Sequence, residues 1–229
     1  MIKKAMILAA GFGKRLNPLT LETPKPLLKI GEETLLSNTI IFLEKFKVKE
    51  IVINIHYLGE QIKEYINKKK FNVNITIINE SEKILDTGGG IFNALNYFDE
   101  SFLCINPDTI WNLNYIDELK KMENYFFLKK QKCCLLIVNK KRSFDKTLVG
   151  DFNLHNGLIT RKKNENLQYL YTGLQIIKPE IFSNINEKIF SVNKIWDRLI
   201  RSEELFGLES KIDFLHVSNL DIYKKLNIK

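Results

Sequence analysis

Residues 5–10 of this chain read AMILAA, and residues 11–15 read GFGKR. The first segment is short and apolar, which favours a strand buried on both faces of a sheet. The second segment brings Gly11 and Gly13 to the end of that strand, where backbone N–H groups can approach an anion closely. Arg15 adds positive charge where phosphate oxygens would lie. We therefore expect residues 5–9 to form a buried first strand that ends in an anion-binding turn.

Apolar, β-branched segments alternate with amphipathic segments after this first strand. Further strands are predicted at residues 50–55, 73–78, 102–106 and 133–139, and helices at residues 34–47, 59–70, 90–97 and 115–128. This alternation is the pattern of βαβ units in a mostly parallel sheet. The predicted fold class is therefore α/β, with a doubly wound, mostly parallel, Rossmann-like sheet. Ligand chemistry is expected at the carboxyl ends of its strands.

The second half of the chain has a different pattern. Residues 149–154 and 158–162 flank His155-Asn156-Gly157, which is typical of a β-hairpin, and residues 170–177 read as another strand. No repeat and no Pro-, Gly- or Ser-rich linker separates the halves, and 229 residues suffice for one substantial core. We expect a single domain over residues 1–229. Its second half should complete the same sheet with a small β-rich region and cover the site.

The composition excludes several classes of protein. Hydrophobic residues make up 45% and charged residues 27% of the chain, which disfavours a disordered or fibrous protein. No apolar stretch approaches the roughly 20 residues that cross a bilayer, and the N-terminus lacks a signal-peptide cleavage pattern. Cys104, Cys133 and Cys134 lie in strand-like runs, as expected for core residues in a reducing compartment. We predict a cytoplasmic protein that spans no membrane.

A formal net charge of +8 indicates anionic partners. Nucleic acid, a membrane surface and phosphorylated small molecules all fit that charge. The chain has no zinc-finger spacing and no RNP-like aromatic motif, which argues against nucleic acid. We expect small phosphorylated molecules as partners, with no nucleic acid, no membrane and no evident protein partner.

A second basic element follows the turn at Thr23-Pro24-Lys25-Pro26. Proline fixes its own φ and restricts the residue before it, so Lys25 should sit on a stiff, extended backbone suited to a polyphosphate. The better-known phosphate motifs do not fit. A P-loop needs Ser or Thr after its lysine, and a Rossmann fingerprint needs a small residue where Leu16 stands. The alternative is a surface turn with incidental basic residues.

Two further strand ends carry candidate ligand groups. Asp86-Thr87-Gly88-Gly89-Gly90 precedes a predicted helix, and three glycines there would let a flat ligand press against the backbone. The alternative is a glycine-rich turn without chemistry. Glu80, at the end of the preceding strand, either frames such a ligand or is a solvated loop carboxylate.

Asn106-Pro107-Asp108 ends the predicted strand at residues 102–106. A carboxylate on a rigid strand end, facing a polyphosphate, is the hard oxygen ligand that Mg²⁺ prefers. Asp108 could instead cap the next turn, because Pro-Asp is a common turn pair. Both interpretations place Asp108 at the same edge of the sheet as the anion-binding turn.

Together these motifs resemble the sugar-1-phosphate nucleotidyltransferases, whose signature places Gly-x-Gly-x-Arg upstream of Pro-Lys-Pro. Lys25 follows Arg15 by ten residues, within that pattern. The resemblance runs along nearly the whole chain and is greatest to the short N-acetylmuramate-1-phosphate uridylyltransferase group of peptidoglycan recycling. The matching segments are residues 50–58 (EIVINIHYL), 86–91 (DTGGGI), 150–152 (GDF) and 171–176 (YTGLQI).

The resemblance implies a fold of the nucleotide-diphospho-sugar transferase type and a reaction that joins UTP to N-acetylmuramate 1-phosphate with release of pyrophosphate. It implies Mg²⁺, or Mn²⁺, as cofactor. Residues 1–140 would bind the nucleotide, and residues 141–229, with C-terminal helices, the sugar phosphate. Arg15, Lys25 and Asp108 would be catalytic, and Asp108 and His216 would hold the metal. The implied nucleotide contacts are Ala10, Gly11, Gly13, Lys14, Arg15, Lys25, Glu80, Thr87, Gly88 and Gly89. The implied sugar-phosphate contacts are Asn106, Asp151, Thr172 and Gly173.

The chain departs from the family at the second metal ligand. The family has an Asp in a C-terminal Asp-x-Gly-Thr stretch, and the matching residues here are His216-Val217-Ser218-Asn219. Imidazole favours softer ions than Mg²⁺ and brings no negative charge. His216 could ligate the metal, contact phosphate when protonated, or be structural. The change leaves open a nucleotide-sugar-binding protein without catalysis, and the resemblance also leaves open GTP with mannose 1-phosphate, or CTP with phosphocholine.

Overall fold

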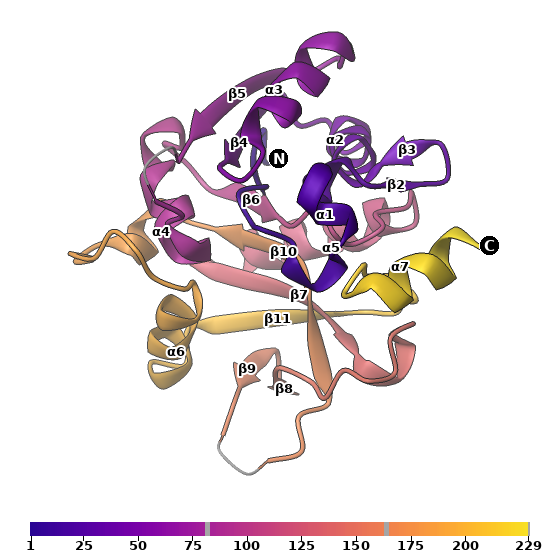
Figure 1. Ribbon diagram of the computed structural model, residues 1–229. Helices are drawn as coiled ribbons and strands as arrows, with labels where there is room; N and C mark the ends of the chain where they lie inside the picture. The colour runs from indigo at the N-terminus through magenta and orange to yellow at the C-terminus, as the bar shows by residue number, and fades with distance from the viewer. Residues whose placement is uncertain (81–82, 163–164, 229) are drawn as a thin grey trace.

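Residues 1–80, 83–162 and 165–228, which the computed structural model describes, form one nine-stranded sheet with helices on both faces (Figure 1). The strand order is β5-β4-β1-β6-β10-β7-β11-β9-β8, and a separate two-stranded hairpin pairs β2 with β3. The strands are β1 (Lys4–Leu8), β2 (Lys29–Ile30), β3 (Glu33–Thr34), β4 (Glu50–Ile55), β5 (Asn74–Asn79), β6 (Phe102–Ile105), β7 (Cys133–Asn139), β8 (Asn153–His155), β9 (Leu158–Thr160), β10 (Tyr169–Ile177) and β11 (Leu205–Ser210). The predicted α/β class with a mostly parallel sheet is confirmed.

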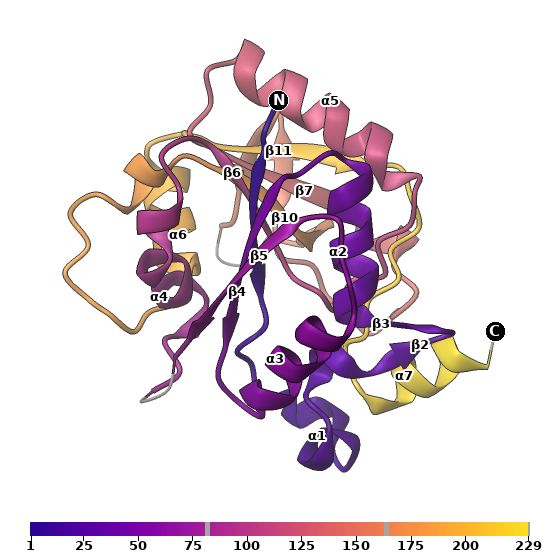
Figure 2. The same ribbon diagram turned by 90° about the horizontal axis from the view of Figure 1, so that it is seen from above.

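Most of the helices form two layers, one on each face of the sheet, whereas the helices at Leu19–Glu22 and Leu220–Asn227 lie outside these layers, next to the turn after β1 (Figure 2). The helices are α1 (Leu19–Glu22), α2 (Leu35–Lys45), α3 (Gly59–Lys68), α4 (Asp86–Asn93), α5 (Tyr115–Leu128), α6 (Asn193–Arg201) and α7 (Leu220–Asn227). In β1, Ala5 and Ile7 pack in a core with α2, α3 and α5, whereas Met6 packs in a second core with α4 and α6. Strand β1 is therefore buried on both faces, as its uninterrupted apolar sequence predicts.

Strands β5, β4, β1 and β6 are parallel, with Ile7 opposite both Ile53 and Ile105. Their carboxyl ends consequently meet at one edge. Strand β10 lies between β6 and β7 and is antiparallel to both, although it comes after them in the chain. The second half therefore enters the middle of the sheet, and its last strand, β11, runs parallel to β7.

The predicted hairpin is present as β8 and β9 at the edge of the sheet. Asn156 (φ 51°) and Gly157 (φ 83°) supply the left-handed backbone that such a tight turn requires. Helix α7 lies beside the N-terminal hairpin in both views (Figures 1 and 2). Its residues Ile222 and Leu226 pack with Leu16, Leu28 and Leu35, so the C-terminus of the described chain supports the turn that follows β1.

Cys104, Cys133 and Cys134 are free and fully buried, which confirms that they are core residues. No helix among the described residues has both the length and the apolar character needed to cross a bilayer.

Candidate active site

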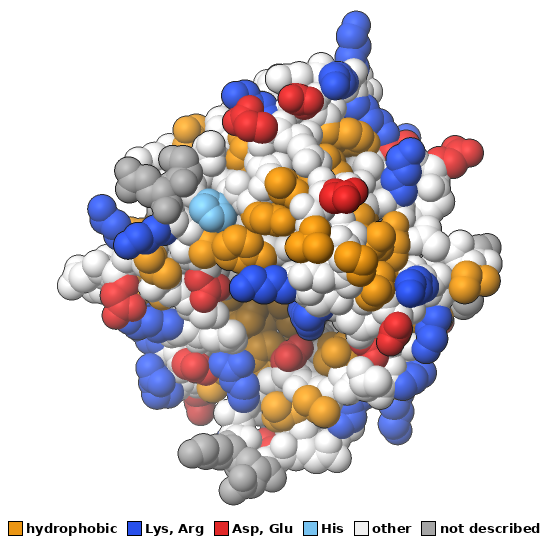
Figure 3. Space-filling model, viewed as in Figure 1, with side chains coloured by type: hydrophobic (Ala, Val, Ile, Leu, Met, Phe, Trp, Pro, Cys, Tyr) orange, Lys and Arg blue, Asp and Glu red, His pale blue; other side chains and the backbone are white. Residues whose placement is uncertain are grey.

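A pocket of about 420 Å³ opens at the carboxyl ends of the parallel strands. The surface in Figure 3 is hollowed near its centre, and basic side chains border the hollow. Most of the predicted site residues line this pocket: Ala10, Gly11, Gly13, Lys14, Arg15, Lys25, Glu80, Thr87, Asn106 and Asp108. Residues far apart in sequence therefore meet in one concave site, as expected at the edge of an open α/β sheet.

The turn after β1 is packed closely at Gly13 and open to solvent at Gly11. Gly13 has a φ of +66°, and a Cβ there would come within 3.0 Å of Lys25 Cβ and Thr20 Cγ2. The Thr20 hydroxyl donates to the Gly13 carbonyl at 3.0 Å. By contrast, a Cβ on Gly11 would have no neighbour within 4 Å, and Arg15 is exposed. The turn thus offers backbone and positive charge to an anion in the pocket.

Lys25 begins a 3₁₀ turn, Lys25–Leu27, instead of lying on the extended backbone that its two proline neighbours predict. The N–H of Leu27 donates to the Pro24 carbonyl at 2.8 Å, and that of Leu28 to the Lys25 carbonyl at 3.1 Å. These bonds outweigh the steric preference for an extended residue before proline. The backbone is still held firmly, so the lysine side chain projects across the pocket from a fixed base.

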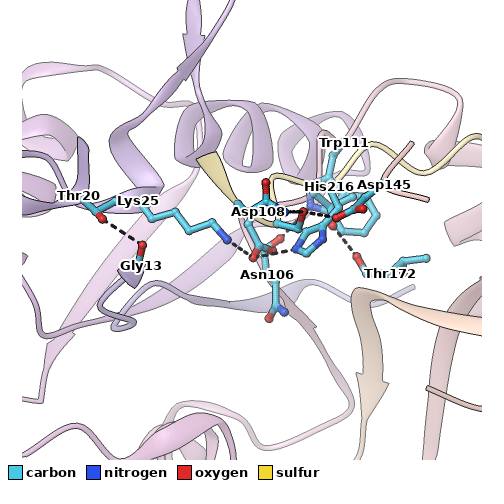
Figure 4. A network of polar contacts seen from close by, with 12 residues as sticks. Gly13, Thr20, Lys25, Asn106, Asp108, Trp111, Asp145, Thr172 and His216 are labelled. Carbon is cyan, nitrogen blue, oxygen red and sulfur yellow. Dashed lines mark hydrogen bonds and ion pairs between the residues drawn. The ribbon is translucent and has the colours of Figure 1, made fainter. Parts of the chain in front are cut away.

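The Lys25 ammonium pairs with the Asp108 carboxylate, with Nζ 2.6 Å from Oδ2 (Figure 4). The two side chains are 14% and 19% exposed. Burial alone would raise the pKa of Asp108, but Lys25 and His216 outweigh it and hold that pKa well below its ordinary value. Among the described residues, no backbone N–H donates to the carboxylate of Asp108. Its alternative role as a turn cap is therefore wrong.

His216 reaches Asp108 from the C-terminal segment, with Nε2 3.1 Å from Oδ2. The backbone of His216 forms a bridge with Thr109, and its ring stacks on Phe214 with centroids 5.5 Å apart. Its other ring nitrogen, Nδ1, is buried and has no hydrogen-bond partner among the described residues. The family resemblance implied that Asp108 and His216 share a metal site, and the structure brings the two side chains together.

Glu80 belongs to a buried network and is not solvated, because it is only 5% exposed. Its Oε1 accepts from Asn54 Nδ2 at 2.7 Å, and its Oε2 accepts from the Leu85 N–H at 3.0 Å. Asn54 Oδ1 in turn accepts from the Ala9 N–H at 3.0 Å. The network ties the ends of β1, β4 and β5 together at the wall of the pocket. Sequence reasoning missed Asn54, although an amide inside the apolar run of β4 was a signal for such a role.

The glycines at residues 88–90 lie within α4 and pack closely. A Cβ would come within 2.5 Å of the Phe190 ring at Gly88, 2.2 Å of the Lys188 carbonyl at Gly89 and 2.8 Å of Asn54 Nδ2 at Gly90. Helix α4 therefore starts at Asp86, four residues before the predicted start, since this packing overrides the low helix propensity of glycine. Gly88 and Gly89 do not line the pocket, so the structure gives them a packing role, and their contact with a nucleotide stays a prediction.

The four predicted sugar-phosphate residues separate into different positions. Asn106 lines the pocket, and its N–H donates to the Gly173 carbonyl at 2.7 Å. Thr172 is 1% exposed, and its hydroxyl donates to the Leu136 carbonyl at 2.8 Å. That hydroxyl is used inside the sheet, and the contact of Thr172 with a sugar phosphate stays a prediction. Asp151 is exposed outside the pocket, where its Oδ2 accepts from the Tyr171 N–H at 2.9 Å, and its sugar contact stays a prediction.

The side chains of the pocket suit a cation that is bound by one protein carboxylate and by the phosphates of a substrate. Among the described residues, no three His, Cys, Asp or Glu side chains converge as a metal site. Mg²⁺ is commonly held by one or two carboxylates together with substrate phosphates. Asp108, at the wall of a pocket lined by Lys14, Arg15 and Lys25, fits that arrangement. The site can therefore bind a polyphosphate through fixed positive charge and offer one carboxylate beside it.

Comparisons with known proteins agree with this chemistry. Residues 4–145 match the family model described as Nucleotidyl transferase. The chain is similar to the N-acetylmuramate alpha-1-phosphate uridylyltransferase of Caulobacter vibrioides, at 28% identity over 95% of this chain and 92% of that protein. The protein of the same name from Neisseria meningitidis serogroup B is 32% identical over 80% of this chain and 78% of its own. The structure of HddC from Yersinia pseudotuberculosis complexed with GMP-PN shares the fold, with a TM-score of 0.78 at 22% identity over 99% of each chain.

We expect the Asp108 carboxylate to stabilise the fold in a pH-dependent way. Its lowered pKa means that the folded state favours the ionised form, so its contribution is full above the ordinary Asp pKa of about 3.9 and declines as the pH falls below it. Urea unfolding should show wild type more stable than Asp108→Asn at neutral pH, with a smaller difference near about pH 3. Asp99→Asn, at a side chain that is 87% exposed, is the control. A difference that is constant with pH would contradict the lowered pKa of Asp108.

We also expect Asn54→Ala to lower the free energy of unfolding by about 1–3 kcal/mol, because the Ala9 N–H and Glu80 Oε1 would each lose a buried partner. Urea denaturation measures the change. Asn67→Ala, on the exposed side of α3, is the matched control and should stay within about 0.5 kcal/mol of wild type. Equal losses in the two variants would exclude a special role for Asn54.

Proposed function

The chain belongs to the nucleotidyl transferase family, and we propose that it joins UTP to N-acetylmuramate 1-phosphate, giving UDP-N-acetylmuramate and pyrophosphate. The coarser activity, transfer of a nucleotidyl group to a sugar 1-phosphate, follows from the family and from relatives that match most of the chain. The observation that carries the proposal is the pocket itself, where the β1 turn, Arg15, Lys25 and Asp108 face one cavity.

The proposed reaction requires the protein to align the two substrates and to stabilise negative charge. In the proposed reaction an oxygen of the sugar 1-phosphate bonds to the α-phosphorus of UTP. The bond from that phosphorus to the oxygen bridging to the β-phosphate breaks, and pyrophosphate leaves. The attacking oxygen is already ionised near neutral pH, so no general base is required. Catalysis of this kind depends on alignment of the two phosphates and on stabilisation of the charge that develops between them.

Each described group has a place in that scheme. The backbone of the β1 turn, open at Gly11, would hold the triphosphate, while Arg15 and Lys25 would stabilise the charge on the leaving pyrophosphate. Lys25 is paired with Asp108, so the phosphates of a nucleotide would offer the ammonium a second anion. Asp108 would hold Mg²⁺, or Mn²⁺, which neutralises charge at the α-phosphate when bound.

The identity of the substrates rests on the relatives. The two uridylyltransferases named above act, by their names, on N-acetylmuramate 1-phosphate, and one of them matches 95% of this chain. GTP is the second candidate donor, because a structural neighbour was solved with GMP-PN on the same fold.

A substrate panel tests the proposal. Pyrophosphate release is measured with UTP, GTP, CTP and dTTP, each combined with N-acetylmuramate 1-phosphate, N-acetylglucosamine 1-phosphate, mannose 1-phosphate or phosphocholine, under Mg²⁺, Mn²⁺ or Co²⁺. We expect the highest kcat/KM for UTP with N-acetylmuramate 1-phosphate. A higher value for another pair would reassign the substrates, and nucleotide binding without any turnover would indicate a binding protein.

Lys25→Ala should reduce kcat/KM for the best substrate pair by at least about 100-fold, the loss typical of one key electrostatic donor. Lys120→Ala, on the exposed face of α5 outside the pocket, is the matched control and should leave the rate unchanged. Near-normal pyrophosphate release by Lys25→Ala would remove this lysine from the mechanism.

A further inference from the structure

The segment that carries His216 is held firmly against the end of β6. The Ile110 N–H donates to the Leu215 carbonyl at 2.8 Å, and the Val217 N–H donates to the Asp108 carbonyl at 2.9 Å. Thr109 and His216 form a backbone bridge between these two bonds. The ring of His216 is therefore fixed beside Asp108 by main-chain pairing, and its Nε2 lies 3.1 Å from Asp108 Oδ2.

The buried Nδ1 atom distinguishes between two roles for this ring. If Nε2 bound a metal ion, a neutral ring would carry its proton on Nδ1, and metal-binding histidines normally donate that proton to a carboxylate or carbonyl. Here Nδ1 is buried without a partner among the described residues, so its N–H would be an orphaned donor. If instead Nε2 carries the proton and donates it to Asp108, Nδ1 keeps only a lone pair, and buried unpaired acceptors are tolerated better than donors.

The two oxygens of Asp108 are used unequally. Oδ2 faces both Lys25 Nζ, at 2.6 Å, and His216 Nε2, at 3.1 Å. Oδ1 accepts no hydrogen bond in the part of the chain that the structure describes. The position of the histidine backbone is set by main-chain pairing, which involves no residue of the turn that carries Lys25.

We propose that His216 is a positioning residue for Asp108 and not a metal ligand: it donates its Nε2 proton to Oδ2 and leaves Oδ1 to face the divalent cation. This inference rests on the proposed function. Asp108 would then hold the cation without His216, and the remaining ligands would come from the nucleotide phosphates and water, as is common for Mg²⁺. A histidine can occupy the position of the family's second carboxylate without providing a second negative charge to the ion.

Proton location is the direct test. Long-range ¹H–¹⁵N spectra report which ring nitrogen carries a proton, and His216 is assigned by the signals that disappear in His216→Gln. The spectra are recorded on the free protein and with Mg²⁺ plus α,β-methylene UTP, a nucleotide that cannot be cleaved at the α-phosphate. We expect a proton on Nε2 in both states. Loss of the Nε2 proton, with a proton on Nδ1, in the loaded protein would overturn the proposal.

Rescue by a conservative variant is the second readout. A glutamine amide can place an N–H where the histidine has Nε2, whereas alanine cannot. We expect His216→Gln to keep kcat within about fivefold of wild type and His216→Ala to lose at least about tenfold, the effect of one hydrogen bond to a charged group. His155→Gln, at an exposed histidine in β8, is the matched control. Equal losses in His216→Gln and His216→Ala would contradict the positioning role.

These readouts separate failure of this inference from failure of the proposed function. If wild type turns over no substrate pair in the panel, the proposed function is wrong, and the ring spectra of the free protein still test the hydrogen bond. If turnover is normal and the loaded protein has lost its Nε2 proton, only the positioning role is wrong.

Discussion

The ion pair between Lys25 and Asp108 is the interaction on which the pocket depends. A carboxylate at the end of a central strand is costly to bury without a compensating cation, and Lys25 supplies that cation from a separate part of the chain. The pair therefore joins the turn at Lys25–Leu27 to the end of β6. Because both groups lie in a partly closed pocket, their charges interact more strongly than an exposed pair would.

The rest of the site is built to keep these charges in place. Helix α7 and the segment with His216 return the C-terminal part of the chain to the N-terminal turn, through apolar packing on one side and strand-like bonds on the other. On the opposite wall, Asn54 and Glu80 join three strand ends by buried hydrogen bonds. Groups fixed in advance in this way need little reorganisation when a charged ligand arrives.

The elements that could be predicted from the sequence are those whose hydrophobic pattern involves only neighbouring residues. Strands β4 and β7 and helix α5 have the predicted ends, since an uninterrupted apolar run and a 3.6-residue period are properties of neighbouring residues. The turn after β1 was predicted for the same reason: glycines and basic residues at a strand end have local consequences. Helix α1 and strand β11 lay outside those predictions, and helix α6 was expected only as one of the C-terminal helices, without bounds. Helix α1 has four residues, too few to show a helical period, and β11 is stabilised by pairing with β7, which is distant in sequence.

The sequence by itself therefore determined the α/β class, the buried first strand, the anion-binding turn and the identity of the charged groups. Only the tertiary structure decided where those groups meet. The insertion of β10 between β6 and β7, the inward direction of the Thr172 hydroxyl, the burial of Glu80 and the shared oxygen of Asp108 all arise from contacts between residues distant in sequence. Such pairings depend on which strands become neighbours, and no short-range pattern encodes that choice.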